Sequence, residues 1–486
     1  MSELRNITSA VSEWANSLPR GLWIVTGLYL LVNLILAVLA VPGASLAQGG
    51  DSGSYWNPAL ALLKHGGFVQ LDNPAEPDFY RTPLYPLMIA GLIWLFGESP
   101  GAVVVVQLCL LFGTGLIFRD TVRNWLPGWE NFGMGLIVLN PNLLGTAHLI
   151  QSETLYLFFM AIGFWALLRI VREDFRWHNS LTIGLSLAAA CLAKPTSQFL
   201  VVVIPIALPL IALVAGARSE WVRLLVQGAT AAVVALAIMA PWASKLASNG
   251  NGYALSAHEI RYRYLWDQVM MLEANLHGIS YHAAAGRIIA PGSYHANVIA
   301  AQGERWATLS KTERYAVLEQ HGYGAIFSYP PEVIFRVMAR SVAQFMVSGG
   351  AGNLHNLLGT DTGRLNQVWF KTSQQDVGGM LKSFFGGAPP GALFISIVCL
   401  GFALVARLIG LVGVVAIWQS RQFALLLTLL GLIGYFVAVH LFHGNSRYRI
   451  PVEPAMMLLV LFGLQAMWDW FRTRRPGKPA EDTSGR

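Results

Sequence analysis

A short polar stretch, Gln48 to Trp56 (QGGDSGSYW), follows the first long apolar run of the chain. Asp51 is the first acid after that run, and its neighbours are glycines and aromatic residues rather than charges. A carboxylate in such surroundings is partly desolvated, which suits a general base. The same position also suits the N-cap of a helix beginning at Ser52. The two roles are compatible, because a capping carboxylate keeps one oxygen free.

Several other charged or histidine side chains stand next to the ends of apolar runs, where they can share a site with Asp51. Two carboxylates among several cations suit the transfer of a group from a phosphate leaving group. These candidate residues are Asp51, Arg81, Glu153, Lys194, His258, Arg261, Arg263, His443, Arg447 and Arg449.

Most of these residues also have a simpler interpretation. Glu153 opens an apolar run, where an acid favours a helix N-terminus. Lys194 can snorkel to the membrane surface, and Arg81, Arg447 and Arg449 can anchor to lipid headgroups. His258 and Arg261 are three residues apart, so they can form an ordinary solvated pair on one helix face.

The composition describes a polytopic membrane protein. Of the 486 residues 55% are hydrophobic and 12% are charged, about half the charged fraction of an ordinary soluble domain. The net charge of +7 comes from short basic clusters between apolar runs, which is a topology signal and argues against nucleic-acid binding. Three cysteines, Cys109, Cys191 and Cys399, lie inside apolar runs, so we expect neither a disulfide framework nor a cysteine metal site.

Apolar runs near the length of a membrane span predict an all-α polytopic fold with about 10 to 12 spans. The first run follows a lead that is too long for a signal peptide, so we expect it to be retained as a helix. The runs cover residues 21–41, 101–118, 132–150, 154–168, 181–193, 198–216, 224–242, 392–418, 423–442 and 450–468.

Basic clusters fall in alternate loops, which predicts a cytoplasmic N-terminus. This regularity requires the apolar stretch 84–96, with Pro83 and Pro86 at its start, to be a re-entrant or interfacial helix. The clusters are Arg119 and Arg123; Arg169, Arg172 and Arg176; Arg218 and Arg223; Arg421; and Arg472, Arg474, Arg475 and Lys478.

The same pattern predicts four regions. Residues 1–242 form a catalytic transmembrane module with a first outer loop at 42–100. Residues 243–390 form a large outer segment, a small helical subdomain with an interfacial helix near 331–346. Residues 391–471 are C-terminal transmembrane helices, and residues 472–486 are a cytoplasmic basic tail.

Four short motifs resemble those of the GT-C superfamily, the polytopic glycosyltransferases that use polyprenyl-phosphate-linked sugars. The similarity is to the branch of the aminoarabinose and galacturonosyl transferases and the protein mannosyltransferases. Asp51 to Tyr55 resembles the Asp-Glu-x-x-Tyr of the first outer loop, and FYRTPLYP at 79–86 resembles the basic and proline-containing stretch that follows. SETL at 152–155 resembles the acidic motif that opens a span, and SRYRIP at 446–451 resembles an Arg-Tyr-x-x-Pro stretch. Lys194-Pro195 and HEIR at 258–261 are looser matches.

The resemblance implies an inverting transfer with a set of catalytic and binding residues. Asp51 would be the catalytic base, and Glu153 would orient the acceptor or a cationic partner. No cofactor is expected, although Ser52 and Glu153 depart from the family pattern and leave a divalent ion open, with Glu76 and Asp78 as weak candidates. Donor phosphate would be held by Arg81, Lys194, Arg261 and Arg447, and further substrate contacts would come from Tyr55, Tyr85, His258 and Tyr448.

The expected function is therefore a membrane glycosyltransferase that acts at the non-cytoplasmic face, in a bacterial inner membrane with the site facing the periplasm. Its partners would be a polyprenyl-phosphate sugar, membrane lipids and a lipid, glycan or protein acceptor. A transporter or flippase of lipid-linked sugars and a glycan ligase with a diphosphate donor are the alternatives. Transporters place ionisable groups near the bilayer midplane, whereas these runs carry charges almost only near their ends.

Overall fold

The structure is a computed structural model that describes residues 19–47, 51–360 and 389–473. Within these residues every regular element is a helix, and the extended backbone pairs only in an isolated bridge between Val69 and Pro77. Gln48 to Gly50 and nearly all of the expected basic tail at 472–486 lie outside the described residues.

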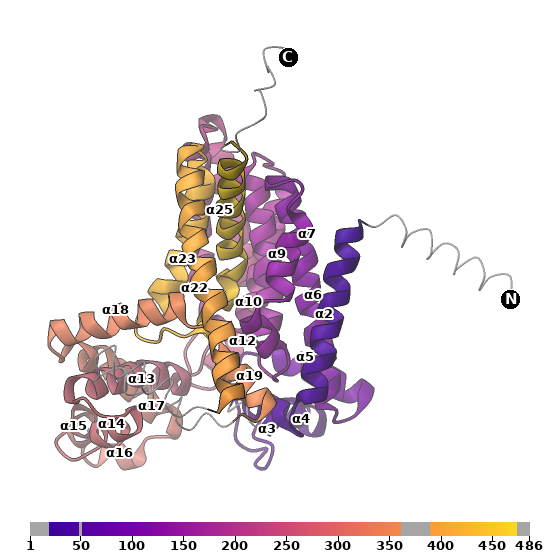
Figure 1. Cartoon of the computed structure of the whole chain (residues 1–486). Helices are drawn as coiled ribbons and strands as arrows, with labels where there is room; N and C mark the ends of the chain where they lie inside the picture. Colours follow the sequence, from indigo (N-terminus) through magenta and orange to yellow (C-terminus); the bar gives the residue numbers. More distant parts are fainter. Residues whose placement is uncertain (1–18, 48–50, 361–388, 474–486) are drawn as a thin grey trace.

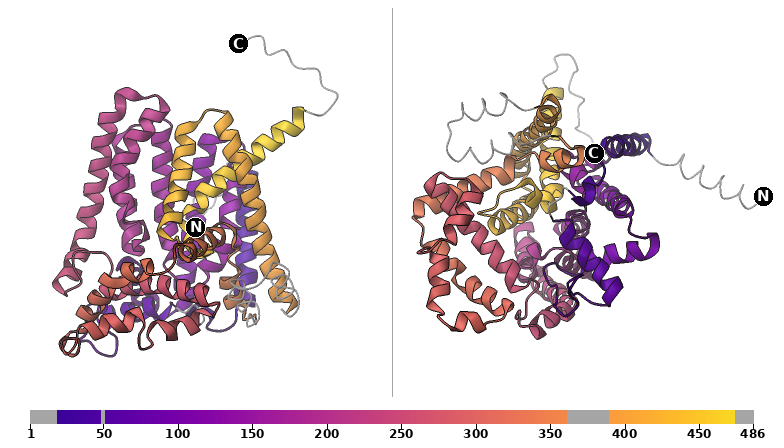
Figure 2. Two further views of the ribbon diagram at one scale, coloured as in Figure 1. Left: turned by 90° about the vertical axis from the view of Figure 1, so that its left-hand side faces the viewer. Right: turned by 90° about the horizontal axis from the view of Figure 1, so that it is seen from below.

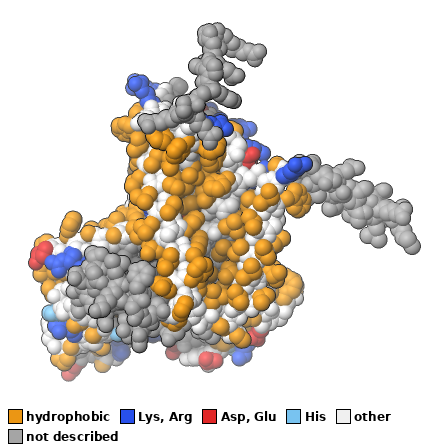
Figure 3. Space-filling view, viewed as in Figure 1, with side chains coloured by type: hydrophobic (Ala, Val, Ile, Leu, Met, Phe, Trp, Pro, Cys, Tyr) orange, Lys and Arg blue, Asp and Glu red, His pale blue; other side chains and the backbone are white. Residues whose placement is uncertain are grey.

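Six of the described helices are long and apolar enough to cross a membrane. Three shorter apolar helices pack with them, namely α5 (Leu84–Phe96), α11 (Leu200–Ala215) and α23 (Phe423–Val439). The fold is thus an all-α transmembrane bundle, and apolar side chains cover much of the bundle on the face shown in Figure 3. The long helices are α2 (Arg20–Leu39), α6 (Pro100–Trp125), α9 (Glu153–Val171), α12 (Trp221–Ser248), α22 (Pro390–Gln419) and α25 (Glu453–Thr473).

Two apolar runs expected as spans take other forms. The run 132–150 is divided into α7 (Glu130–Val138) and α8 (Pro141–Ala147), because Pro141 cannot continue the hydrogen-bond ladder of α7. The Asn140 side-chain oxygen accepts a hydrogen bond from the Asn142 N–H and so caps the new helix. The run 181–193 belongs to α10 (Trp177–Ala193), which begins in the polar residues before the run. A hydropathy count therefore overstates the number of long, unbroken spans.

The two ends of the bundle differ in character. Glu153 opens α9 and Lys194 follows α10, and the two side chains form an ion pair, so both helices have these termini at one end, here called the site end. The other end of α9 meets the last turn of α6, because Arg172 donates to the Asn124 carbonyl. Basic side chains gather at this second end, called the basic end, where α25 finishes (Figures 1 and 3).

Helix α5 does not cross the bundle. Arg81 lies just before it at the site end, and α6 starts at Pro100 and reaches the basic end with Asn124. Both flanks of α5 are therefore at the site end, and its 13 residues span only ~20 Å. The stretch 84–96 is a re-entrant or interfacial helix, as the charge pattern predicts.

The outer segment lies at the site end, to one side of the bundle, as a group of helices with its own apolar core (Figure 2). Helix α18 connects this core to the bundle, because it buries Val333 and Val337 in the outer core and Phe345 in the main core. The outer helices are α13 (His258–His277), α14 (Tyr281–Ile288), α15 (Tyr294–Ala301), α16 (Arg305–Thr308), α17 (Lys311–Phe327), α18 (Pro331–Val347) and α19 (Ala351–Leu358).

Candidate active site

The Asp51 carboxylate is held between two arginines. Its Oδ1 lies 2.7 Å from Arg81 Nη2, and its Oδ2 lies 2.6 Å from Arg447 Nη1. The N-cap of α4 (Gly53–His65) is Ser52, and no side chain makes a capping bond there. The carboxylate therefore does not cap this helix, and its partners are those of a phosphate-binding or acid–base site.

Ion pairs continue from Asp51 to a second carboxylate. Arg447 Nε donates to Glu153 Oε1, and Lys194 Nζ lies 2.6 Å from the same oxygen. The resulting order is Arg81, Asp51, Arg447, Glu153, Lys194, with the signs alternating. Three cations against two carboxylates leave one net positive charge. One more anion would neutralise the cluster.

Five helices bring these five residues together at the site end. Asp51 precedes α4, Arg81 precedes α5, Glu153 is the first residue of α9, Lys194 follows α10, and Arg447 lies in the short helix α24 (Ser446–Arg449). The Asp51 side chain is 35% exposed, whereas the Glu153 side chain is 1% exposed. Asp51 is thus accessible to a substrate, whereas Glu153 is sealed beneath the cations that it pairs with.

Aromatic and hydroxyl groups fix the direction of Arg81. Its Nε donates to Ser54 Oγ at 2.8 Å, and its guanidinium lies 4.3 Å from the centre of the Tyr55 ring. Tyr55 Oη is in turn 3.0 Å from the Ser152 hydroxyl, which immediately precedes Glu153. Arg81 is therefore locked in place by packing and hydrogen bonds, as a preorganised phosphate ligand requires.

Two further tyrosines expected at the site occupy different depths. Tyr85 is completely buried, and its hydroxyl donates to Gln107 Oε1 at 2.5 Å, so it supports the Tyr55 ring from below. Tyr448 stacks on His440 with ring centres 4.3 Å apart, and Lys194 Nζ lies 5.3 Å from the Tyr448 ring centre. Of these two tyrosines, Tyr448 contacts the charged cluster and Tyr85 does not.

His258 and Arg261 are not brought into the cluster. Both contact Glu319 of α17, through His258 Nδ1 at 2.6 Å and Arg261 Nε at 2.7 Å. Arg261 also donates to the Ser256 and Asn251 carbonyls. Its part in donor binding stays a prediction, and in this structure its guanidinium holds the outer segment together.

Another arginine of α13 lies closer to the cluster. The Arg263 guanidinium is 5.4 Å from the centre of the Tyr80 ring, and Arg81 lies 4.9 Å from the same ring. Tyr80 is ordered by its own N–H, which donates to Asp78 Oδ1 at 3.0 Å. Arg263 follows Arg261 by two residues, so the sequence shows both arginines but not which one faces the site.

The electrostatics of Asp51 follow from these contacts. Burial by itself would raise the pKa of the Asp51 carboxyl, but the charges of Arg447 and Arg81 outweigh burial and hold this pKa below its ordinary value. Asp51 is therefore ionised at neutral pH. It is a weak base until the neighbouring cations are neutralised.

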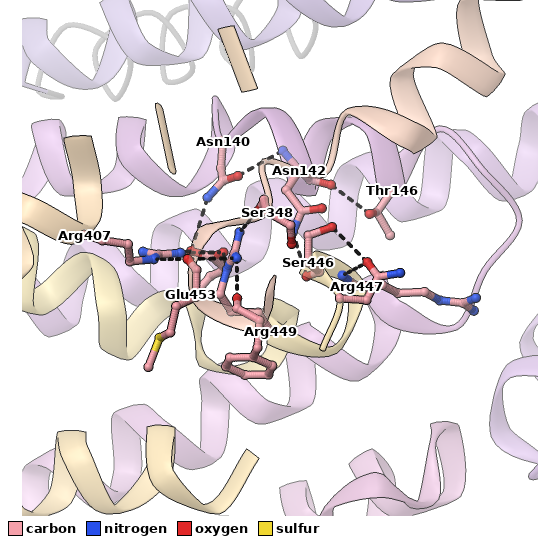
Figure 4. A network of polar contacts seen from close by, with 12 residues as sticks. Asn140, Asn142, Thr146, Ser348, Arg407, Ser446, Arg447, Arg449 and Glu453 are labelled. Carbon is pink, nitrogen blue, oxygen red and sulfur yellow. Dashed lines mark hydrogen bonds and ion pairs between the residues drawn. The ribbon is translucent and has the colours of Figure 1, made fainter. Parts of the chain in front are cut away.

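A second charged cluster takes up Arg449, one of the residues expected beside Asp51, together with Glu453 and Arg407. Arg447 and Arg449 extend from the same turn to opposite sides, and Arg449 Nε lies 2.6 Å from Glu453 Oε1 (Figure 4). Arg407, in the middle of α22, also contacts Glu453 at 3.3 Å. A helical i,i+4 spacing of Arg449 and Glu453 was the available signal. Arg407 interrupts the apolar run 392–418 and is an exception to the expected placement of charges near the ends of the runs.

These buried arginines attach the C-terminus of α18 to the bundle. Arg449 Nη1 donates to the Phe345 carbonyl at 2.5 Å and its Nη2 to the Ser348 carbonyl at 2.9 Å. Arg407 Nε donates to the Met346 carbonyl at 3.1 Å. The outer segment is thus tied to the turn that presents Arg447.

No protein-family model and no curated protein matches the chain. Among solved structures, the chain resembles ArnT from Cupriavidus metallidurans in the apo state, with 15% identity over 90% of this chain and 77% of that chain and a TM-score of 0.38. It also resembles the archaeal oligosaccharyltransferase AglB from Archaeoglobus fulgidus, in complex with an inhibitory peptide and a dolichol-phosphate. There the identity is 13% over 94% of this chain and 52% of that chain, with a TM-score of 0.45. At this level of similarity, neither neighbour assigns a role to a residue of this chain.

Proposed function

We propose that the chain is a glycosyltransferase that moves a sugar from a polyprenyl-phosphate donor to a hydroxyl of a lipid, glycan or protein acceptor. The observation that carries the proposal is a half-exposed carboxylate, Asp51, held between two arginines in a cluster with one surplus positive charge. A phosphate fits the arginines, and a base beside the phosphate fits attack on the sugar that it bears.

In the proposed reaction, Asp51 takes the proton of the acceptor hydroxyl as its oxygen attacks the anomeric carbon. The new bond joins that oxygen to C1, and the bond from C1 to the donor phosphate breaks on the opposite face. The phosphate leaves with the bonding electron pair, so the configuration is inverted. Arg81 and Arg447 stabilise the departing charge, and Lys194 supports them.

Donor binding would also activate Asp51. In the free protein, Arg447 and Arg81 lower the Asp51 pKa, which weakens it as a base. A phosphate that pairs with the same guanidinium groups neutralises part of their charge, so the pKa of Asp51 rises toward its ordinary value. The base becomes effective only when the donor is in place, which would limit wasteful hydrolysis.

Glu153 acts through the cations rather than on the substrate. Its side chain is 1% exposed, and it contacts both Arg447 and Lys194. We infer that Glu153 keeps these two cations together near the donor phosphate. It is a positioning residue, and Asp51 is the catalytic one.

The rest of the site end accommodates the substrates. The outer segment, with Arg263 against Tyr80, would contribute to acceptor binding, and the polyprenyl chain would lie against apolar helices. Basic clusters set membrane orientation, so the basic end would be cytoplasmic and the site would face the periplasm of a bacterial inner membrane.

The proposal is tested with purified protein in detergent and a panel of polyprenyl-phosphate hexoses and pentoses, each with lipid, glycan and peptide acceptors. We expect release of free polyprenyl phosphate with at least one donor, without an ion gradient and in the presence of EDTA. In sealed vesicles, movement of an intact lipid-linked sugar without bond cleavage would instead show a flippase. Activity only with a diphosphate donor would show a ligase.

A further inference from the structure

A cavity lies at the basic end, far from Asp51. It has a volume of about 440 Å³ and opens between the last turns of α6 and α9. Glu153 and Arg169 stand near opposite ends of α9, so this cavity and the active site are on opposite sides of the bundle. The cavity is called the basic-end pocket, and its principal lining residues are Asp120, Arg123, Trp125, Trp165, Arg169 and Arg172.

The basic-end pocket is lined by more arginines than carboxylates. Arg123 pairs with Asp120, and Arg169 Nε lies 3.1 Å from Asp174 Oδ2. Arg172 has no carboxylate partner in the part of the chain that the structure describes. It donates to the Asn124 carbonyl and lies over the Trp125 ring. One arginine is therefore left with a charge that an anion can pair with.

Two tryptophans make the pocket amphipathic. Trp125 is the last residue of α6, and Trp165 Nε1 donates to Asp120 Oδ2 at 2.9 Å. The Arg169 guanidinium lies 4.9 Å from the centre of the Trp165 ring. Indole rings at the ends of spanning helices favour the headgroup level of a bilayer. The pocket thus joins a cationic site to aromatic surfaces suited to a lipid.

We propose that the basic-end pocket binds the headgroup of an anionic phospholipid, with the phosphate on Arg172 and the glycerol portion against the tryptophans. The volume is many times the ~30 Å³ of one water molecule, so it admits a group larger than a bare phosphate. Its position at the end of two spans places it at the headgroups, where basic pockets between helices take up anionic lipids. The proposal does not depend on the transferase reaction.

The test measures lipid binding to the purified full-length protein by native mass spectrometry in a neutral detergent. Phosphatidylglycerol is titrated against phosphatidylcholine, with inorganic phosphate and glycerol 3-phosphate as competitors. We expect Arg172→Gln to weaken phosphatidylglycerol binding about fivefold. Asp120→Asn keeps an acceptor for Trp165 but removes a negative charge, so it should strengthen binding by a similar factor. The matched control is Arg218→Gln, an exposed arginine at the basic end outside the pocket, which should change nothing.

Opposite effects of Arg172→Gln and Asp120→Asn, with no effect of Arg218→Gln, support the proposal, because general damage would weaken binding in both pocket variants. Equal losses for Arg172→Gln and Arg218→Gln would overturn it in favour of diffuse attraction to a charged surface. Effective competition by inorganic phosphate or glycerol 3-phosphate would overturn the lipid assignment and indicate a site for soluble phosphates. If Arg172→Gln does not fold, Arg172→Lys, which keeps the charge, must retain selectivity for phosphatidylglycerol over phosphatidylcholine.

Discussion

Arg447 Nη1 lies 2.6 Å from Asp51 Oδ2, although 396 positions separate the two residues in the sequence. The contact joins the first outer loop to the turn that precedes the last helix. The site is therefore complete only when the C-terminal helices have packed onto the N-terminal module. It also makes Arg447 the central cation, because the same guanidinium contacts Glu153.

Arg447→Gln should reduce sugar transfer about 100- to 1,000-fold, because it removes a donor to the charge that develops on the leaving phosphate. Arg447→Lys should recover only part of this loss, since a lysine cannot contact both carboxylates with one planar group. The measurement is kcat with a saturating donor. Arg421→Gln, at the basic end, is the control and should stay near wild type; a comparable loss there would argue against a phosphate role for Arg447.

The pH dependence of the reaction should differ between free and donor-bound protein. The acid limb of kcat/KM reports the pKa of Asp51 in the free protein. Because Arg447 and Arg81 lower this pKa, the limb should lie below pH ~3.9, the ordinary pKa of an aspartic acid. The acid limb of kcat should lie at higher pH, because the bound phosphate neutralises those cations. Arg81→Gln should move the kcat/KM limb upward. Coincident limbs in the wild type would show that donor binding does not tune Asp51.

Two arginines of α13 should behave differently. Arg261→Ala leaves Glu319 with fewer partners, so it should lower the melting temperature of the protein. Arg263→Ala removes an exposed side chain that lies over Tyr80, so it should raise KM with little effect on stability. Measurements of KM and of the melting temperature for both variants distinguish the two roles. A stable Arg261→Ala protein with strongly impaired donor use would restore Arg261 to the phosphate site.

Loss of the buried Glu453 charge should lower the stability of the fold, and any loss of activity would follow from that. Glu453→Gln leaves Arg407 and Arg449 facing each other, and breaking a buried pair typically costs about 3 to 5 kcal/mol. Asp469→Asn, on the exposed part of the same helix, should change stability by less than about 0.5 kcal/mol. Thermal unfolding in detergent measures both. Equal stability of the two variants would mean that Glu453 is not the counter-ion of this cluster.

Much of the fold was predictable, because hydropathy and alternating basic clusters report directly on the bilayer. The re-entrant placement of α5 followed from charge alone, before any contact was known. The break at Asn140 was not predicted, although Pro141 marks it, because a run of apolar residues hides a polar turn when the turn is buried. The length of an apolar run reflects the thickness of the bilayer, whereas a break in a helix depends on local backbone chemistry.

The candidate site was predictable as a set of residue types, but its pairings were not. The outer ends of several helices suggested Asp51, Arg81, Glu153, Lys194 and Arg447, and the structure brings these five together. His258 and Arg261 matched a motif more loosely, and the structure pairs both with Glu319 instead. Glu319 lies far from His258 and Arg261 in the sequence and belongs to none of the motifs. Short motifs identify the side chains capable of the chemistry, and tertiary packing decides which of them are available.

The most direct test of the proposed reaction is the turnover of Asp51→Asn. The variant keeps the size of the side chain and one oxygen near Arg81 and Arg447 but removes the base, so we expect kcat to fall by about two to four orders of magnitude. Donor affinity should be preserved or increased, because one negative charge beside the phosphate is lost. Asp72→Asn and Asp78→Asn, in the same outer loop, should stay near wild type. Most of the wild-type turnover surviving in Asp51→Asn would contradict Asp51 as the catalytic base.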